Sequence, residues 1–125
     1  MPVPWEEASR FGILTADEDG RISKFTEKPK KPDSNLASMG IYIFTADLLV
    51  ETLKEDANDQ NSSHDFGGDI IPKLLEAGKR LYTYKFEGFW RDVGTISSYH
   101  ETSMDLLGPN PAFDIFSNEF PIMSN

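Results

Sequence analysis

The sequence predicts a layered α/β fold in which helices cover a mixed sheet. Three observations lead to this prediction. Two short β-type segments flank a glycine-containing turn, a long apolar run follows them, and helical apolar spacing comes after that run. We expect the element order β-β-β-α-α-β-α. At 125 residues, the chain is long enough for one modest domain.

A hairpin and a buried strand are predicted first. Residues 11–15 and a segment through Ile22 and Phe25 favour strands. The acidic residues and the glycine at 17–20 favour a turn between them. Residues 36–45 (LASMGIYIFT) are almost continuously apolar, with β-branched and aromatic members, which is typical of a strand covered on both faces.

Three helices are predicted after the hairpin and the buried strand, over 46–56, 69–77 and 96–107. A threonine precedes the first and the third and is placed to cap each, and a glycine follows the second. Alternation over 81–86 favours a strand between the last two helices. Residues 108–125 contain three prolines, so we expect an extended linker there and a single domain over 1–107.

Composition argues against several classes of protein. The net charge of −9 argues against a nucleic-acid partner, because phosphate contacts need lysine and arginine. No apolar run approaches the ~20 residues that span a bilayer, so we expect no membrane partner. The chain has no cysteine, which excludes disulfides and thiolate metal sites and fits a cytoplasmic location.

A local positive site is predicted around residues 21–31, which carry five of the twelve basic residues. Within it, the ammonium of Lys28 suits a phosphate, and the carboxylate of Glu27 suits sugar hydroxyls. The alternative is a solvated hairpin with an exposed ion pair.

Asp92 is the candidate metal ligand. It lies in FWRDVGT (89–95), where a strand end is expected to lead into a capped helix. Ligands gather where strands of α/β sheets end, so a carboxylate there is well placed to hold Mg²⁺ beside substrate phosphates. The alternative is that Asp92 pairs with Arg91 or organises the turn.

Residues 61–68 (NSSHDFGG) are predicted to be a loop fixed by side-chain hydrogen bonds. The neighbouring His64 and Asp65 suggest a metal site or a catalytic dyad, but adjacent residues rarely face each other usefully. The sequence contains no G-x-x-x-x-G-K-[ST], G-x-G-x-x-G or G-x-S-x-G pattern. We therefore expect a phosphate-and-cation site without a nucleotide-binding loop.

Five motifs occur in order: SRFG at 9–12, FTEKP at 25–29, LASMGIYIF at 36–44, NSSHDFGGDIIP at 61–72 and FWRDVGT at 89–95. Together they closely resemble the ADP-glucose pyrophosphorylases (glucose-1-phosphate adenylyltransferases), in the C-terminal part of their nucleotidyltransferase catalytic domain. EKP and W-x-D-x-G-T are shared with other sugar nucleotidyltransferases. The SMGIY strand and the NSSHDFG loop point to the ADP-glucose branch.

The resemblance implies a transferase of glycogen biosynthesis that converts ATP and glucose 1-phosphate into ADP-glucose and pyrophosphate with Mg²⁺. It implies glucose 1-phosphate contacts at four positions, Gly12, Glu27, Lys28 and Ser38. Lys28 would hold the phosphate and the other three would meet the sugar. Asp92 is implied as a catalytic residue and as one of two aspartates that hold the metal.

The resemblance also implies a partial domain: a mixed sheet with helices, without the N-terminal nucleotide-binding half. Residues 1–107 would be the sugar-phosphate-binding part, and 108–125 would lead toward an absent C-terminal β-helix domain. We expect such a fragment to be inactive alone and its parent to be a homo-oligomer, namely a tetramer. The alternatives are a fragment of a thymidylyl- or uridylyltransferase, or a non-catalytic binding or assembly module.

Overall fold

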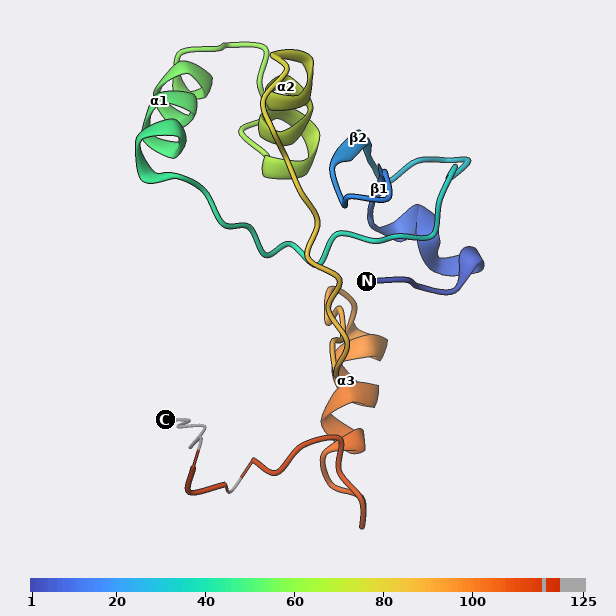
Figure 1. The fold of residues 1–125 in the computed structure, drawn as a ribbon. Helices are drawn as coiled ribbons and strands as arrows, with labels where there is room; N and C mark the ends of the chain where they lie inside the picture. Colours follow the sequence, from blue (N-terminus) through green and yellow to red (C-terminus); the bar gives the residue numbers. More distant parts are fainter. Residues whose placement is uncertain (116, 120–125) are drawn as a thin grey trace. The chain divides into compact units, whose positions relative to one another are not determined.

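The computed structural model describes residues 1–115 and 117–119, in two compact units that divide between Phe86 and Glu87. The elements of the first unit are the 3-10 helix η1 (Trp5–Arg10), the strands β1 (Gly12–Ala16) and β2 (Ile22–Glu27), the helix α1 (Ala46–Ala57), the π-helix η2 (Phe66–Ile70) and the helix α2 (Ile71–Glu76) (Figure 1). The second unit contains α3 (Ile96–Asp105). This combination of a two-stranded sheet and helices confirms the α/β class.

The predicted hairpin is present. β1 and β2 pair antiparallel, with Leu14 opposite Phe25, and a register irregularity follows Thr15. In the turn, the Gly20 N–H donates to the Asp17 carbonyl at 3.0 Å. Gly20 has φ +81°, a left-handed conformation that glycine adopts without steric cost.

The core of the first unit lies on both faces of β1. Consecutive strand residues point to opposite faces, and Ile13 and Leu14 are both buried. Ile13 packs in one cluster with Val3, Ala8 and Ala37. On the other face, Leu14 and Phe25 pack against Ile71 of α2, so the hairpin and α2 share one core.

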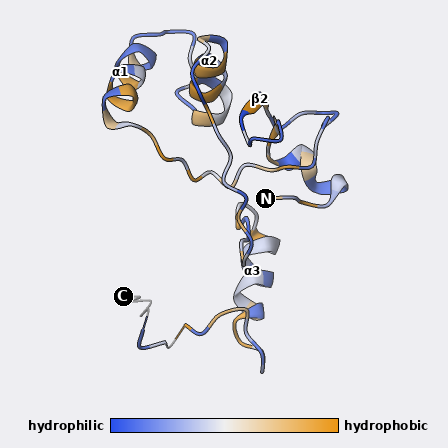
Figure 2. Ribbon diagram, viewed as in Figure 1, coloured by the Kyte–Doolittle hydropathy of each residue, from blue (hydrophilic) through white to orange (hydrophobic). Residues whose placement is uncertain are grey.

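The predicted strand over 36–45 is wrong in its extent. Only Leu36 and Ala37 form β-bridges, with Pro2 and Ile13. In the described part of the chain no strand pairs with residues 39–44, so their backbone has no ladder to join. Figure 2 shows the hydrophobic residues of the segment that precedes α1.

The predicted strand over 81–86 is also wrong. Tyr82 makes a single bridge to Arg21, and Tyr84 is 87% exposed. Alternating side chains favour a strand, but a strand forms only where a neighbouring strand pairs with the backbone.

The helices of the first unit follow the prediction with shifted ends. α1 starts after Thr45, although the Thr45 side chain accepts no capping hydrogen bond. The second helical segment begins earlier than expected, because η2 starts at Phe66. Gly78, with φ +69°, follows its end, as predicted.

In the second unit, the predicted cap of α3 is confirmed. The Ser98 N–H donates to Thr95 Oγ1 at 3.1 Å, and the Thr95 N–H donates to Ser98 Oγ at 3.2 Å. This reciprocal capping box satisfies two backbone donors that a helix start otherwise leaves unpaired. No described helix has the length and apolarity needed to cross a membrane. The division into a domain over 1–107 and a linker over 108–125 stays a prediction.

Candidate functional site

The four residues predicted to bind glucose 1-phosphate lie together at one end of the hairpin. Gly12 and Glu27 are partners across the ladder. The Ser38 N–H donates to the Gly12 carbonyl at 2.8 Å, and the Lys28 N–H donates to the Phe11 carbonyl at 3.1 Å. Antiparallel register and these two hydrogen bonds therefore bring three separate sequence motifs into one place.

The Glu27 and Lys28 side chains are adjacent and differ in exposure. Lys28 Nζ lies 3.8 Å from Glu27 Oε1, and the side chains are 69% and 32% exposed respectively. An exposed pair of this kind contributes only about 0–1 kcal/mol to stability. The ion pair of the alternative interpretation is thus present, and its weakness leaves the ammonium available to a phosphate. Lys28 also has φ +44°, a strained conformation for lysine.

Gly12 and Ser38 are tied to the local packing. A Cβ atom on Gly12 would lie 2.6 Å from Phe25 Cζ and 2.7 Å from Glu27 Oε2, so only glycine fits there without a shift. Ser38 Oγ shares a hydrogen bond with the Tyr42 hydroxyl at 3.1 Å. It also accepts the Gly40 N–H at 3.2 Å. The serine hydroxyl is therefore held in a defined orientation.

Sequence reasoning missed two neighbours of this site. Tyr42 orients Ser38, and Gly67 of η2 approaches the Glu27 carboxylate so closely that a Cβ atom at position 67 would overlap Oε2. The signal for Gly67 is the glycine pair inside the NSSHDFGG segment, which the sequence predicts only to be a loop fixed by side-chain hydrogen bonds.

Asp92 lies in the second unit, before the Thr95 cap. Its Oδ1 accepts the Gly94 N–H at 3.2 Å, so it does organise the turn. Arg91 Nη2 lies 3.7 Å from the Asp105 carboxylate. Because Asp92 and Lys28 belong to different units, their convergence on one substrate stays a prediction.

Asp92 offers Mg²⁺ one carboxylate. Among the described residues, no group of three or more histidine or acidic side chains is arranged to hold a metal ion. Mg²⁺ is commonly held by one or two carboxylates together with waters and substrate phosphates. A single aspartate fits that mode, in which the substrate completes the coordination.

The predicted loop over 61–68 is confirmed only over 61–65, where side-chain hydrogen bonds fix it, because residues 66–68 belong to η2. His64 does not pair with the neighbouring Asp65: its Nδ1 lies 2.8 Å from Asp56 Oδ2. Asp56 is 5% exposed and also accepts the Ser62 hydroxyl at 2.6 Å. Lys73 Nζ of α2 lies 3.2 Å from Asp56 Oδ1, so α1, the loop and α2 meet at one carboxylate.

These contacts predict an acid-dependent loss of stability. Hydrogen bonds from Ser62 and His64, followed by Lys73, lower the pKa of Asp56 to about 2. The unfolded value is about 3.9, so Asp56 stabilises the fold above that pH and loses its contribution as the pH falls toward 2. We expect the wild-type free energy of unfolding to fall more steeply across this window than that of Asp56→Asn, measured by urea unfolding at a series of pH values.

Asp47→Asn is the matched control, since Asp47 is an exposed aspartate on the same helix. It should keep the wild-type pH dependence. Equal slopes for Asp56→Asn and the wild type would contradict the role of the Asp56 network.

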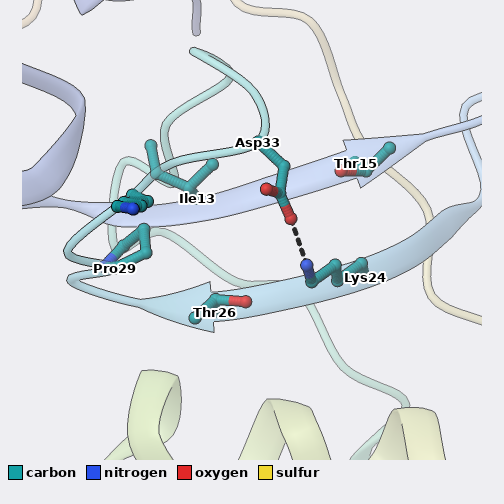
Figure 3. A pocket seen from close by; sticks show the side chains of 7 residues that line it. Ile13, Thr15, Lys24, Thr26, Pro29 and Asp33 are labelled. Atoms are coloured by element: carbon teal, nitrogen blue, oxygen red, sulfur yellow. Dashed lines mark hydrogen bonds and ion pairs between the residues drawn. The ribbon is translucent and has the colours of Figure 1, made fainter.

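An open hollow on the hairpin is separate from the four residues. It is lined by Ile13, Thr15, Lys24, Thr26, Pro29, Lys31 and Asp33. Figure 3 shows Lys24 paired with Asp33 at this hollow. Part of the basic segment over 21–31 is therefore already neutralised, which leaves Lys28 as the lysine beside the candidate sugar site.

Residues 1–108 match the nucleotidyl transferase family model, so the chain belongs to the nucleotidyl transferase family. Its relatives include proteins named glucose-1-phosphate adenylyltransferase. That of Desulfitobacterium hafniense is 53% identical over 100% of this chain and 31% of the relative. That of Thermotoga neapolitana is 57% identical over 93% of the chain and 28% of the relative. That of Clostridium acetobutylicum is 54% identical over 98% of the chain and 32% of the relative.

These matches confirm the predicted resemblance to glucose-1-phosphate adenylyltransferases. The chain spans about a third of the length of the relatives it matches, in keeping with a partial nucleotidyltransferase domain. The percentage identities and the shares of the relatives' length that match do not bear out the expected placement of the chain in the C-terminal part of the catalytic domain.

Proposed function

We propose that this chain supplies the glucose 1-phosphate-binding part of a glucose-1-phosphate adenylyltransferase. One observation carries the proposal: Gly12, Glu27, Lys28 and Ser38 gather at one end of the hairpin. The name of relatives that are 53–57% identical to the chain supports the same substrate.

The reaction transfers an adenylyl group. A phosphate oxygen of glucose 1-phosphate bonds to the α-phosphorus of ATP, the bond from that phosphorus to the oxygen bridging it to the β-phosphorus breaks, and pyrophosphate leaves. Such transfers depend on positioning and charge neutralisation rather than on covalent chemistry by the protein. Lys28 would neutralise the sugar phosphate, while Glu27 would accept hydrogen bonds from the sugar hydroxyls.

Mg²⁺, when bound beside Asp92, would neutralise charge on the reacting phosphates. Asp92 would hold the ion in place, and Ser38 and the backbone at Gly12 would orient the sugar. The 125 residues contain no glycine-rich nucleotide loop, so we expect this chain alone to form no ADP-glucose.

The proposal extends to ATP as the second substrate, to a homo-oligomeric assembly and to a cytoplasmic location. Self-association is supported by Ile41 and Ile43, which are 73% and 97% exposed. Two exposed apolar side chains on a segment to which the described residues offer no strand partner favour pairing with another chain.

The test is a titration of the isotope-labelled chain with glucose 1-phosphate, followed by NMR. A charge-assisted hydrogen bond contributes about 1.5–3 kcal/mol, and millimolar affinity requires about 4 kcal/mol. We therefore expect weak binding by the wild type, and binding weakened by about ten- to a hundredfold in Lys28→Ala.

Lys30→Ala is the matched control, because Lys30 is an exposed lysine two positions further along. Its affinity should equal that of the wild type. Equal titration curves for Lys28→Ala and the wild type would remove Lys28 from the site and leave the proposed function without its phosphate ligand.

A further inference from the structure

The Glu27 carboxylate lies between two glycines from different elements. A Cβ atom on Gly12 of β1 would lie 2.7 Å from Glu27 Oε2. A Cβ atom on Gly67 of η2 would overlap the same oxygen and lie 3.0 Å from Glu27 Cδ. The carboxylate therefore occupies space that any larger residue at either position would take.

The approach of Gly67 depends on how η2 starts. Gly67 is buried as the second residue of the π-helix. The Asp65 side chain caps this turn, since its Oδ2 accepts the Gly68 N–H at 2.6 Å. The Phe66 ring stacks on Tyr42, with 5.6 Å between the ring centroids and 18° between the planes. Tyr42 also holds Ser38, so η2 is packed against the candidate sugar site.

The loop before Gly67 is anchored at its other end. Ser62 and His64 both bind the buried Asp56 of α1. Ser63 Oγ donates to Asp69 Oδ2 at 2.6 Å, which ties the loop to the π-helix itself. With hydrogen bonds on both sides of it, Gly67 has a defined position against the hairpin.

We infer that Gly67 is a positioning residue for sugar recognition, which it serves by leaving room for the Glu27 carboxylate at the end of the hairpin. This inference rests on the proposed function, in which Glu27 accepts hydrogen bonds from the sugar. The atom that a residue-67 methyl group would meet is the end of a flexible side chain. Alanine at this position is therefore accommodated by rotation of Glu27, and the fold is kept while the carboxylate moves.

The experiment compares Gly67→Ala with Gly68→Ala. A Cβ atom on Gly68 would meet Asp65 Oδ2 at 3.3 Å and lies away from Glu27, which makes it the matched control in the same helix. Three measurements are made on the full chain: the ¹³C signal of the Glu27 carboxylate without ligand, a glucose 1-phosphate titration, and an inorganic phosphate titration.

In Gly67→Ala, the Glu27 signal should shift, and glucose 1-phosphate should bind about tenfold more weakly, equivalent to ~1.4 kcal/mol. Inorganic phosphate should bind as in the wild type, because Lys28 keeps its charge and place. Gly68→Ala should affect the Glu27 signal and glucose 1-phosphate affinity less than Gly67→Ala does, because its Cβ atom meets the Asp65 side chain rather than Glu27. In a Glu27→Ala background, Gly67→Ala should cause no further loss of glucose 1-phosphate affinity, since the group it displaces is gone.

An unchanged Glu27 signal in folded Gly67→Ala would overturn the inference. So would a shifted signal with unchanged glucose 1-phosphate affinity, or a loss that adds to that of Glu27→Ala. If Gly67→Ala does not fold, the double variant Gly67→Ala/Glu27→Ala decides: restored folding supports the close approach, and failure to fold overturns it. If the wild-type chain bound no glucose 1-phosphate, both the proposed function and the role of Gly67 in sugar recognition would be refuted. The Glu27 signal would still show whether Gly67 determines the position of the carboxylate.

Discussion

Replacing Phe25 with alanine is expected to lower the free energy of unfolding by about 3–5 kcal/mol. The Phe25 ring is 9% exposed and packs with Leu14 and Ile71, so it joins the hairpin to α2. Alanine would leave a cavity at that junction. Since small domains are stable by only about 5–15 kcal/mol, this loss is a large part of the total.

Urea unfolding followed by far-UV circular dichroism measures this loss. Tyr84→Ala is the control, because it removes a similar aromatic group from a side chain that is 87% exposed. Its effect should stay within about 0.5 kcal/mol of the wild type. If the two variants unfolded at the same urea concentration, the shared core of the hairpin and α2 would be contradicted.

The second large effect is expected for Gly12→Ala, which should destabilise the fold by about 1–3 kcal/mol. The new methyl group would lie 2.6 Å from Phe25 Cζ, and the buried ring has little room to retreat. The same methyl group would press on Glu27 Oε2, so glucose 1-phosphate affinity should fall as well. Thermal or urea unfolding and the NMR titration measure the two effects separately.

Gly108→Ala provides the comparison for this substitution. The nearest atom to a Cβ there is the Asp105 carbonyl oxygen at 4.0 Å, so the change should be close to neutral. Combining Gly12→Ala with Phe25→Leu should recover part of the lost stability relative to the sum of the single changes, because leucine removes the ring atoms that the methyl group meets. Strict additivity of the two substitutions would argue against this steric explanation.

The elements that the sequence predicted well are those decided by local chemistry. The hairpin turn depends on Asp17 and on the left-handed Gly20, which both lie within four residues of each other. The start of α3 depends on Thr95, which the sequence predicted as its cap, whereas the reciprocal bond from Ser98 emerges only in the structure. These features depend on residues that are close together in the sequence, so they can be predicted without knowing how distant parts of the chain fold.

The two predicted strands that the structure does not form, over 36–45 and 81–86, would each need a neighbouring strand to pair with. Apolar composition over 36–45 indicates a preference for burial, but it does not specify which backbone will complete the ladder. In the structure Tyr42 and Phe44 pack on the core cluster of the hairpin, whereas Ile43 between them is 97% exposed. The period of two is thus preserved in the side chains without the hydrogen bonds of a strand.

The candidate site was predictable in part. Glu27 and Lys28 are neighbours in the sequence, and the hairpin register explains why Gly12 joins them. The contact between Gly67 and Glu27 was not predictable, because it depends on where η2 starts, and that is set by the Asp65 side chain. No sequence pattern predicts that a π-helix forms at these two glycines.

We expect residues 39–44 to influence how this chain behaves in concentrated solution. Their sequence, MGIYIF, carries no charge, and it combines branched and aromatic residues of the kind that stack into cross-β fibrils. Since Ile43 is almost fully in water, substitutions that strengthen the core would raise the melting temperature without hiding this segment. Alternate side chains of this one segment are therefore expected to affect different properties, with Tyr42 and Phe44 contributing to stability and Ile41 and Ile43 to solubility.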